Sequence, residues 1–260
     1  CRNLNLVAIM PSRSHRVNHQ PVFLLATVPW RESSLRLEVW SRDYGRVGLL
    51  ARSARKRQSE LRGVLVSFVP ISTSWYGTQD YKTLHRAEWL GGWAQPQGKA
   101  LLSGLYVNEL LLKLTAREDP HPALYDALVD VMQAICGSDN HLAALRIFEW
   151  RLLRELGLAP DLTCDDAGQP IVAEQDYWLR PQFAVMRLAY ARERGMAADL
   201  GVVVRGKTLW QLQQACLTDS EALQQVLQLN RMLLDFYVPQ GIQSRQIWQQ
   251  MQQLPRWLSL

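Results

Sequence analysis

The hydrophobic pattern changes its period once along the chain, and this change does most to limit the fold. Between about residues 20 and 93, apolar residues form short runs or alternate with polar ones, which is typical of strands. Residues 91–98 then bring three glycines and a proline, which mark a boundary. Beyond the boundary, apolar residues recur at three- and four-residue spacing, which predicts helices. The sequence therefore predicts an α+β chain, in which an all-β domain at residues 20–93 precedes a mostly helical one.

Five strand segments are expected in the first domain, at residues 22–27, 35–40, 47–51, 64–75 and 81–90. A turn at residues 44–46 joins the second and third segments as a hairpin. Pro70 interrupts the fourth segment and predicts a bend or an edge position there. Five short strands with no helical period between them predict a small closed barrel.

The second half divides into three parts. Residues 98–157 carry three helical stripes, broken at residues 118–122 and at Gly137. Residues 158–206 are rich in proline and glycine and predict loops, with a short strand at residues 202–204. Residues 207–260 return to a helical pattern, in which Thr218 and Glu221 have capping-box spacing. These three stripes and the later helices are expected to form a helical core.

The first residues and the cysteines limit the cellular setting. Residues 1–19 hold an apolar patch at residues 6–10, shorter than the ~7–15 residues of a signal-peptide core. We expect residues 1–19 to be a disordered or over-extended tail. No apolar run reaches the ~20 residues that span a bilayer, so no membrane partner is expected. None of the four cysteines forms a Cys-x-x-Cys pair, which favours reduced thiols in a cytoplasmic protein.

Positive charge is concentrated in one stretch. Residues 42–62 contain seven basic and two acidic residues, so their local net charge of +5 equals that of the whole chain. Such a field attracts polyanions, and the hypothesis is a nucleic-acid surface; a solvated turn is the alternative. Aromatic residues that are able to stack on bases lie nearby, and the alternative for each is the barrel core. They are Trp30, Trp40, Tyr44, Trp75 and Tyr76. For Trp40 and Trp75 the periodicity does not decide.

Enzyme motifs are missing from the sequence. It contains no Gly-x-x-x-x-Gly-Lys-Ser/Thr loop, no Gly-x-Gly-x-x-Gly after a strand and no Gly-x-Ser-x-Gly elbow. We therefore expect no enzyme, no cofactor and no bound metal. One alternative is a metal-dependent nuclease that holds a cation through acidic residues of the loop-rich region. These are Asp161, Asp165, Asp166, Glu174 and Asp176. A second alternative is an RNA-binding barrel protein.

Several stretches together resemble one family. The most specific is residues 102–111, Leu-Ser-Gly-Leu-Tyr-Val-Asn-Glu-Leu-Leu. Agreeing stretches lie at residues 45–57, 84–88, 118–122, 144–149 and 244–245. In this order they resemble the RecO family of bacterial recombination mediators. The resemblance implies an oligonucleotide-binding (OB) fold at residues 20–93. It also implies that residues 158–206 are a degenerate zinc module, in which only Cys164 remains.

The resemblance implies a non-catalytic role in DNA repair, in the cytoplasm at the nucleoid. The family binds single- and double-stranded DNA and anneals complementary strands, including strands coated by the single-strand-binding protein SSB. It also works with RecR to load RecA in RecF-pathway repair. Expected DNA contacts are Arg31, Arg46, Arg52, Arg55, Lys56, Arg57, Arg62, Trp75, Tyr76 and Lys82.

One partner site also transfers by resemblance. Arg146 matches the family position that contacts the acidic, apolar-ended tail of SSB, and Leu111 and Trp150 are expected beside it. Without the family, Arg146 is better explained as an ordinary surface arginine paired with Glu149, three residues later on the same helix.

Overall fold

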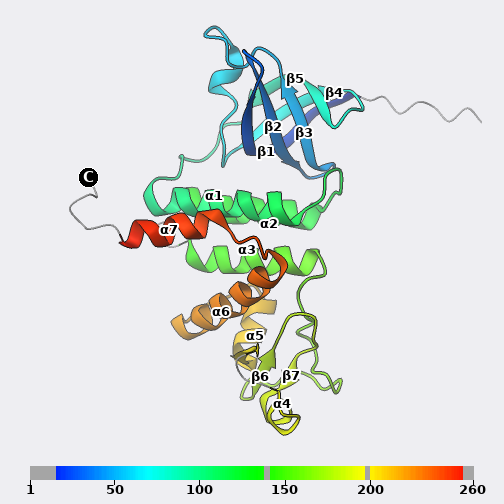
Figure 1. The fold of residues 1–260 in the computed structure, drawn as a ribbon, viewed down its shortest axis with the longest axis vertical. Helices are drawn as coiled ribbons and strands as arrows, with labels where there is room; N and C mark the ends of the chain where they lie inside the picture. The colour runs from blue at the N-terminus through cyan, green and yellow to red at the C-terminus, as the bar shows by residue number, and fades with distance from the viewer. Residues whose placement is uncertain (1–15, 138–140, 197–199, 254–260) are drawn as a thin grey trace, which may run out of the picture.

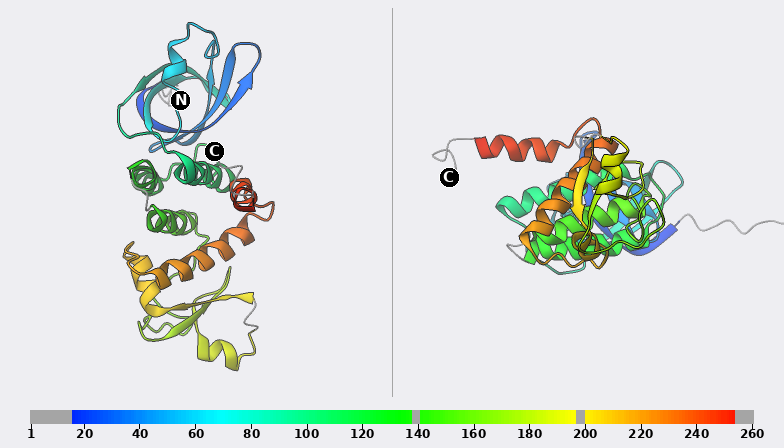
Figure 2. Two further views of the ribbon diagram at one scale, coloured as in Figure 1. Left: turned by 90° about the vertical axis from the view of Figure 1, so that its left-hand side faces the viewer. Right: turned by 90° about the horizontal axis from the view of Figure 1, so that it is seen from below.

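The chain folds as a barrel stacked on layers of helices, with a small sheet at the far end (Figure 1). The structure is a computed structural model that describes residues 16–137, 141–196 and 200–253. The barrel is packed on α1 (Gly98–Leu114) and α2 (Pro122–Gly137), and α3 (Leu142–Glu155) and α6 (Ser220–Tyr237) form the layers below them (Figures 1 and 2).

Five strands close the barrel in the order β1-β2-β3-β5-β4. They are β1 (Arg16–Trp30), β2 (Ser34–Ser41), β3 (Gly45–Ala51), β4 (Pro70–Tyr76) and β5 (Tyr81–Trp89). Neighbouring strands are antiparallel except β3 and β5, which are parallel. Alternate apolar residues such as Leu24, Val39 and Val47 face inward and fill the barrel. The predicted five-stranded, OB-like barrel is confirmed.

Two boundaries in the barrel differ from the prediction. β1 begins at Arg16, and the pairing of Arg16 with Tyr76 and Val17 with Trp75 places residues 16–19 in the barrel rather than in a tail. The remaining tail residues, 1–15, lie outside the described part of the chain. The fourth strand starts only at Pro70, after a 3-10 helix, η1 (Glu60–Gly63). A proline fits the first residue of a strand because no ladder donor is needed there.

Helices dominate the second half, as predicted. The first three are α1 (Gly98–Leu114), α2 (Pro122–Gly137) and α3 (Leu142–Glu155). The later ones are α5 (Gly206–Gln213), α6 (Ser220–Tyr237) and α7 (Gln243–Gln253). Asp219 caps α6 by accepting a hydrogen bond from the Ala222 amide at 2.7 Å, one residue after the predicted Thr218.

A small sheet occupies the region predicted as mostly loop. Its strands are β6 (Asp176–Leu179), β7 (Met186–Arg187) and β8 (Val202–Arg205), in the order β7-β6-β8. A short helix, α4 (Leu188–Glu193), follows β7 directly. The strand expected at residues 202–204 is present, whereas β6, β7 and α4 were not predicted.

Part of the barrel segment belongs to the hydrophobic core of the helical half. Four apolar side chains of the barrel segment join the core cluster of the helical half: Phe23, Leu25, Trp40 and Phe68. Asn108 of α1 reaches into β1, where its side-chain amide donates to the carbonyls of Leu24 and Leu25 at 3.3 and 3.1 Å. The two halves therefore form a continuous packed unit.

A second junction lies where β3 begins. Gly45 has a φ of +64°, and a Cβ there would overlap the backbone of Asp119, between α1 and α2. Glu118 donates its amide to the carbonyl of Arg46 at 3.0 Å. Arg42 pairs with Asp126 of α2 through two hydrogen bonds of 3.1 Å. A glycine is required at this position because the two backbones approach so closely.

Candidate functional site

The loop after β3 presents an open group of positive charges. We call residues 52–62 the basic loop. Its exposed cations are Arg52, Arg55, Lys56, Arg57 and Arg62. Within the described residues, none of the five forms an ion pair with a carboxylate. Their charges therefore remain available to an anionic ligand.

The basic loop is fixed to the barrel rather than free. Ala54 is 2% exposed and packs in the barrel core. The Arg55 amide donates to the carbonyl of Ser33 at 2.8 Å, and its guanidinium donates to the carbonyl of Arg31 at 3.3 Å. Arg31 itself is exposed in the turn between β1 and β2. The structure thus brings Arg31 together with the basic loop, as one cationic surface.

Two other predicted DNA contacts are already occupied. Arg46 donates to the carbonyl of Thr115 at 2.8 Å and lies 3.5 Å from a carboxylate oxygen of Glu38. Lys82 pairs with Glu118, and its side chain is only 14% exposed. Both cations connect the barrel to the segment after α1. We therefore leave them out of the cationic surface.

The aromatic residues divide in the same way. Trp40 and Trp75 are 0% and 1% exposed, so neither offers a ring face to a base. Tyr44 packs edge-on against Trp75 at 5.4 Å between ring centroids. Tyr76 is 44% exposed and lies beside the ring of His85. Of the two predicted aromatic contacts, only Tyr76 has an accessible ring.

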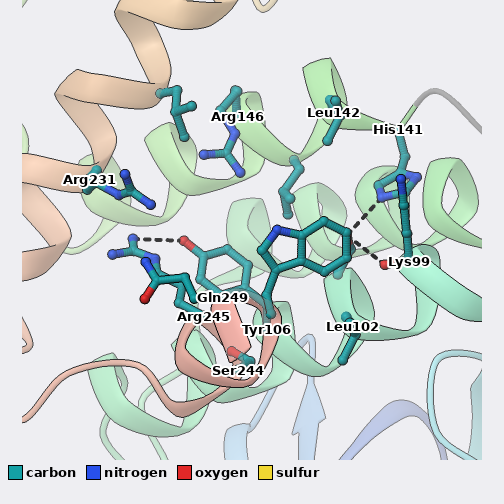
Figure 3. A pocket seen from close by; sticks show the side chains of 14 residues that line it. Lys99, Leu102, Tyr106, His141, Leu142, Arg146, Arg231, Ser244, Arg245 and Gln249 are labelled. Carbon is teal, nitrogen blue, oxygen red and sulfur yellow. Dashed lines mark hydrogen bonds between the residues drawn. The ribbon is translucent and has the colours of Figure 1, made fainter. Parts of the chain in front are cut away.

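A cavity of about 500 Å³ opens among α1, α3, α6 and α7 (Figure 3). Its apolar lining comes from all four helices and consists of Leu102, Leu142, Leu145, Leu227 and Trp248. Four cations also line it: Lys99, Arg146, Arg231 and Arg245. Its other lining residues are Ser103, Tyr106, His141, Ser244 and Gln249. The lining contains no carboxylate, so the cavity suits a ligand with an apolar part and negative charge.

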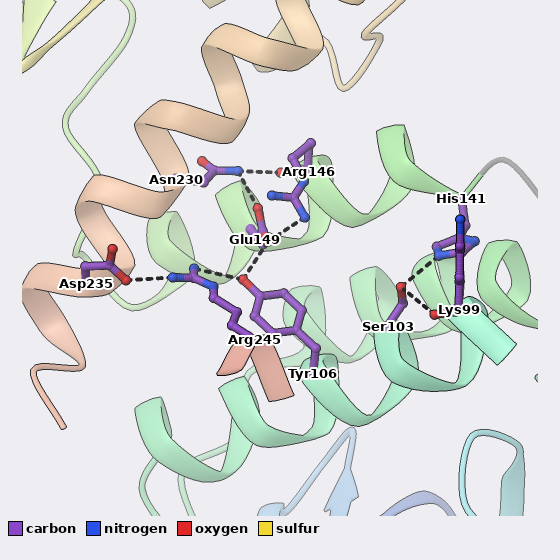
Figure 4. A network of polar contacts seen from close by, with 9 residues as sticks. All are labelled: Lys99, Ser103, Tyr106, His141, Arg146, Glu149, Asn230, Asp235 and Arg245. Atoms are coloured by element: carbon purple, nitrogen blue, oxygen red, sulfur yellow. Dashed lines mark hydrogen bonds and ion pairs between the residues drawn. The ribbon is translucent and has the colours of Figure 1, made fainter. Parts of the chain in front are cut away.

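A buried polar network lies beneath the cavity (Figure 4). Glu149 of α3 is fully buried, and it accepts hydrogen bonds from the Tyr106 hydroxyl at 2.6 Å and the Asn230 amide at 2.9 Å. Arg146 pairs with the same carboxylate at 3.0 Å. Burial, together with the charge of Glu149, raises the pKa of Tyr106 far above its usual value. The network fixes Arg146 in the cavity wall and balances its charge.

The other two arginines differ in their surroundings. Arg245 donates to the Tyr106 hydroxyl at 3.1 Å and pairs with Asp235 at 2.6 Å. Arg231 of α6 is exposed at the cavity rim. It has no ion-pair or hydrogen-bond partner within the described residues. Arg231 is therefore the arginine of the cavity whose charge is not already balanced.

The sequence prediction found only part of this cavity. Arg146 lines it, but Leu111 and Trp150 are 0% and 2% exposed in the helical core and do not. Arg231 was missed, and the Ser244-Arg245 stretch was noted only as a point of resemblance. The cations that line the cavity lie on separate helices, and no local sequence pattern shows that these helices bring them together.

Three of the five acidic residues of the loop-rich region, Asp161, Asp165 and Asp166, are engaged with neighbours. Asp165 has a fully buried side chain that pairs with Arg187 at 2.8 Å. Asp166 pairs with Arg194 at 2.9 Å, and Asp161 accepts from the Thr163 amide at 2.8 Å. In the described ranges, no group of three or more His, Cys, Asp or Glu side chains is placed to hold a metal ion. Nor does any helix in those ranges have the length and apolar character needed to cross a membrane.

Comparison with known proteins identifies both halves of the chain. Residues 16–93 match the family model described as Recombination protein O N terminal, and residues 95–246 match Recombination protein O C terminal. A Neisseria gonorrhoeae protein named DNA repair protein RecO is 58% identical over 243 residues, covering 93% of this chain and 98% of the relative. A protein of the same name from Aromatoleum aromaticum is 41% identical over 245 residues, covering 94% of this chain and 100% of the relative.

Proposed function

The chain belongs to the RecO family of DNA repair proteins, and on this premise we propose that it is a recombination mediator. It binds single- and double-stranded DNA, anneals complementary single strands, and docks on SSB. One observation carries the proposal: the chain has two separate cationic sites, an open one on the barrel and a partly apolar cavity among the helices.

The basic loop and Arg31 hold DNA. Annealing requires that two strands approach each other despite the repulsion between their phosphates. Unpaired cations on a fixed loop neutralise phosphates and release condensed counterions. Base pairing then supplies the stability of the product, so that neither ATP nor a catalytic residue is needed. Binding at this surface weakens steeply with salt.

The cavity takes the acidic, apolar-ended tail of SSB. Its leucines and Trp248 accept the apolar end, while the arginines pair with the carboxylates of the tail. Arg231 is the first contact for these carboxylates, because its charge is otherwise unbalanced. Docking on SSB raises the local concentration of the protein at coated DNA. At such sites it assists RecR in loading RecA, in the cytoplasm beside the nucleoid.

The test is annealing of two complementary oligonucleotides that are first coated with SSB, without ATP and with EDTA, at two salt concentrations. Faster duplex formation that fades with salt supports the proposal. Absence of acceleration by protein with an intact circular dichroism spectrum contradicts it. A magnesium-dependent cleavage assay tests the nuclease alternative, and competition between DNA and RNA tests the RNA-binding one. Three of the five acidic residues behind the nuclease alternative are occupied by arginines or a threonine amide.

A single substitution separates the two sites. Arg231→Glu reverses the free charge of the cavity, so it lowers recruitment to SSB-coated DNA and spares binding to naked DNA. Arg154→Glu is the matched control, because Arg154 is an exposed helical arginine outside the cavity. Arg146→Glu is a poorer test, since it leaves the buried Glu149 beside a second carboxylate. Equal recruitment by the Arg231 and Arg154 variants removes Arg231 from the site.

A further inference from the structure

One wall of the cavity is a helix that is anchored at one end. α7 contributes Trp248 and Gln249 to the lining, and it runs beside α1 with its C-terminal end projecting from the body of the molecule (Figure 2). Ile247, on the middle turn, is 47% exposed. The polar contacts of α7 with other helices are concentrated in its first turn. Beyond that turn, Lys99 lies 5.9 Å from the ring of Trp248.

The anchor is a carboxylate from another helix. Glu109 of α1 accepts from the Gln243 amide at 2.7 Å, and from the amide and hydroxyl of Ser244 at 2.9 and 2.7 Å. Lys113 lies 2.7 Å from the same carboxylate and donates to the carbonyl of Gly241 at 2.6 Å. A negative charge at a helix N-terminus satisfies free amides and matches the helix dipole. Glu109 therefore caps α7 in place of a local residue.

This anchor remains charged at physiological pH. Burial of Glu109 works against its charge, but the hydrogen bonds from Lys113, Ser244 and Gln243 outweigh it and lower the pKa to about 2. Glu109 is not among the residues that line the cavity, so its carboxylate does not repel an acidic ligand there at close range.

We propose that Glu109 is a positioning residue for the peptide cavity. By fixing the first turn of α7, it holds Trp248 opposite α3 before the ligand arrives. This inference rests on the proposed docking of an acidic, apolar-ended peptide and adds a requirement to it. When the cavity wall is ordered before binding, peptide binding does not include the entropic cost of ordering the wall. The peptide affinity therefore depends on Glu109, which the peptide does not touch.

The test measures peptide affinity by fluorescence anisotropy. The probe is a fluorescein-labelled acidic peptide that ends in an aromatic residue. Glu109→Gln keeps the size of the side chain, but its amide group faces hydrogen-bond donors and its charge is lost. We expect about ten-fold weaker binding, the ordering cost of a few side chains. Asp130→Asn makes the same chemical change at an exposed ion pair on α2 and is expected to leave the affinity unchanged. Binding to naked DNA is unchanged in both variants.

A double-mutant cycle separates positioning from a general loss of stability. Trp248→Ala removes the part of the wall that Glu109 positions, so Glu109→Gln has little further effect in that background. A variant that merely lost stability would weaken the peptide equally in both backgrounds. Without peptide, the backbone amides of residues 246–250 exchange hydrogen faster in Glu109→Gln than in the wild type.

The outcomes distinguish this inference from the function on which it rests. Equal peptide affinity of the wild type and Glu109→Gln overturns the positioning role and leaves docking intact. Failure of the wild type to bind the peptide overturns docking itself, and with it the ligand assigned to the cavity. The inference is supported if Glu109→Gln weakens peptide binding in the wild-type background but makes no difference to it in the Trp248→Ala background.

Discussion

The charge of the basic loop makes a quantitative prediction about DNA binding. The variant to make replaces Arg52, Lys56 and Arg57 together with glutamine. Arg55 stays, because its amide and guanidinium anchor the loop to the turn between β1 and β2. The three replaced side chains are exposed and have no carboxylate partner in the described structure, so their removal takes away charge without breaking internal contacts.

The magnitude follows from counterion release. Each single-strand phosphate that is neutralised contributes about 0.7 to the slope of log affinity against log salt. Three lost contacts therefore lower the slope by about 2. If the wild type and the variant have the same DNA affinity near 1 M salt, this difference in slope makes the variant bind DNA about 100-fold more weakly at 0.1 M salt.

The assay is anisotropy of a labelled single-stranded oligonucleotide over a series of salt concentrations. A control variant replaces Arg151, Arg154 and Arg205 with glutamine, because each of these arginines is at least partly exposed and has a carboxylate within 4 Å. The control is expected to keep most of the wild-type slope. If the basic-loop variant keeps the wild-type slope and affinity, or the control loses as much, DNA does not bind where we place it.

Three further predictions concern stability. Gly45→Ala is expected to lower the free energy of unfolding in urea by about 3 kcal/mol or more, because the residue is left-handed and its new Cβ would overlap backbone atoms. Gly168→Ala is the control: the residue is also left-handed but its Cβ would lie in open space, so the expected loss is about 1 kcal/mol. Asp165→Asn removes the carboxylate that Arg187 contacts and is expected to cost about 2 kcal/mol, seen as a lower urea midpoint; an unchanged midpoint would show that this pair is dispensable. The pKa of Glu109 lies below its usual 4.5, so the stability that its charged form contributes is complete above pH 4.5 and disappears toward pH 2. Between neutral pH and about pH 3, the free energy of unfolding should therefore fall less for Glu109→Gln than for the wild type.

Periodicity predicted the elements whose faces are strongly one-sided. The barrel strands and the first three helices bury alternate or helically spaced apolar residues, and a local pattern is enough to find them. Residues 16–19 were missed because three of the four are polar and they join the sheet through backbone pairing with β4. β6 and β7 were missed because strands of four and two residues are too short to show a period.

Of the two candidate sites, the sequence predicted the one that local charge defines. The basic loop is continuous in sequence, and its exposed cations follow from composition. Arg46 lies in the charged stretch at residues 42–62, whereas Lys82 lies beyond it in β5. Their partners, Glu38 and Glu118, come from other parts of the chain, so sequence alone does not show that these two cations are paired. The cavity needs residues from four helices between Lys99 and Gln249, and their meeting depends on the packing of the whole helical half.

The core shared by the barrel and the helices decides how the protein unfolds and how it tolerates cutting. Phe23, Leu25, Trp40 and Phe68 are covered by helices rather than by the barrel itself. Heat or urea is therefore expected to unfold both halves in a single cooperative transition, since neither half keeps its full burial when the other unfolds. A fragment that ends near residue 93 would expose these four side chains together as one apolar surface. Such a fragment is expected to self-associate, so that DNA binding is best measured on the whole chain.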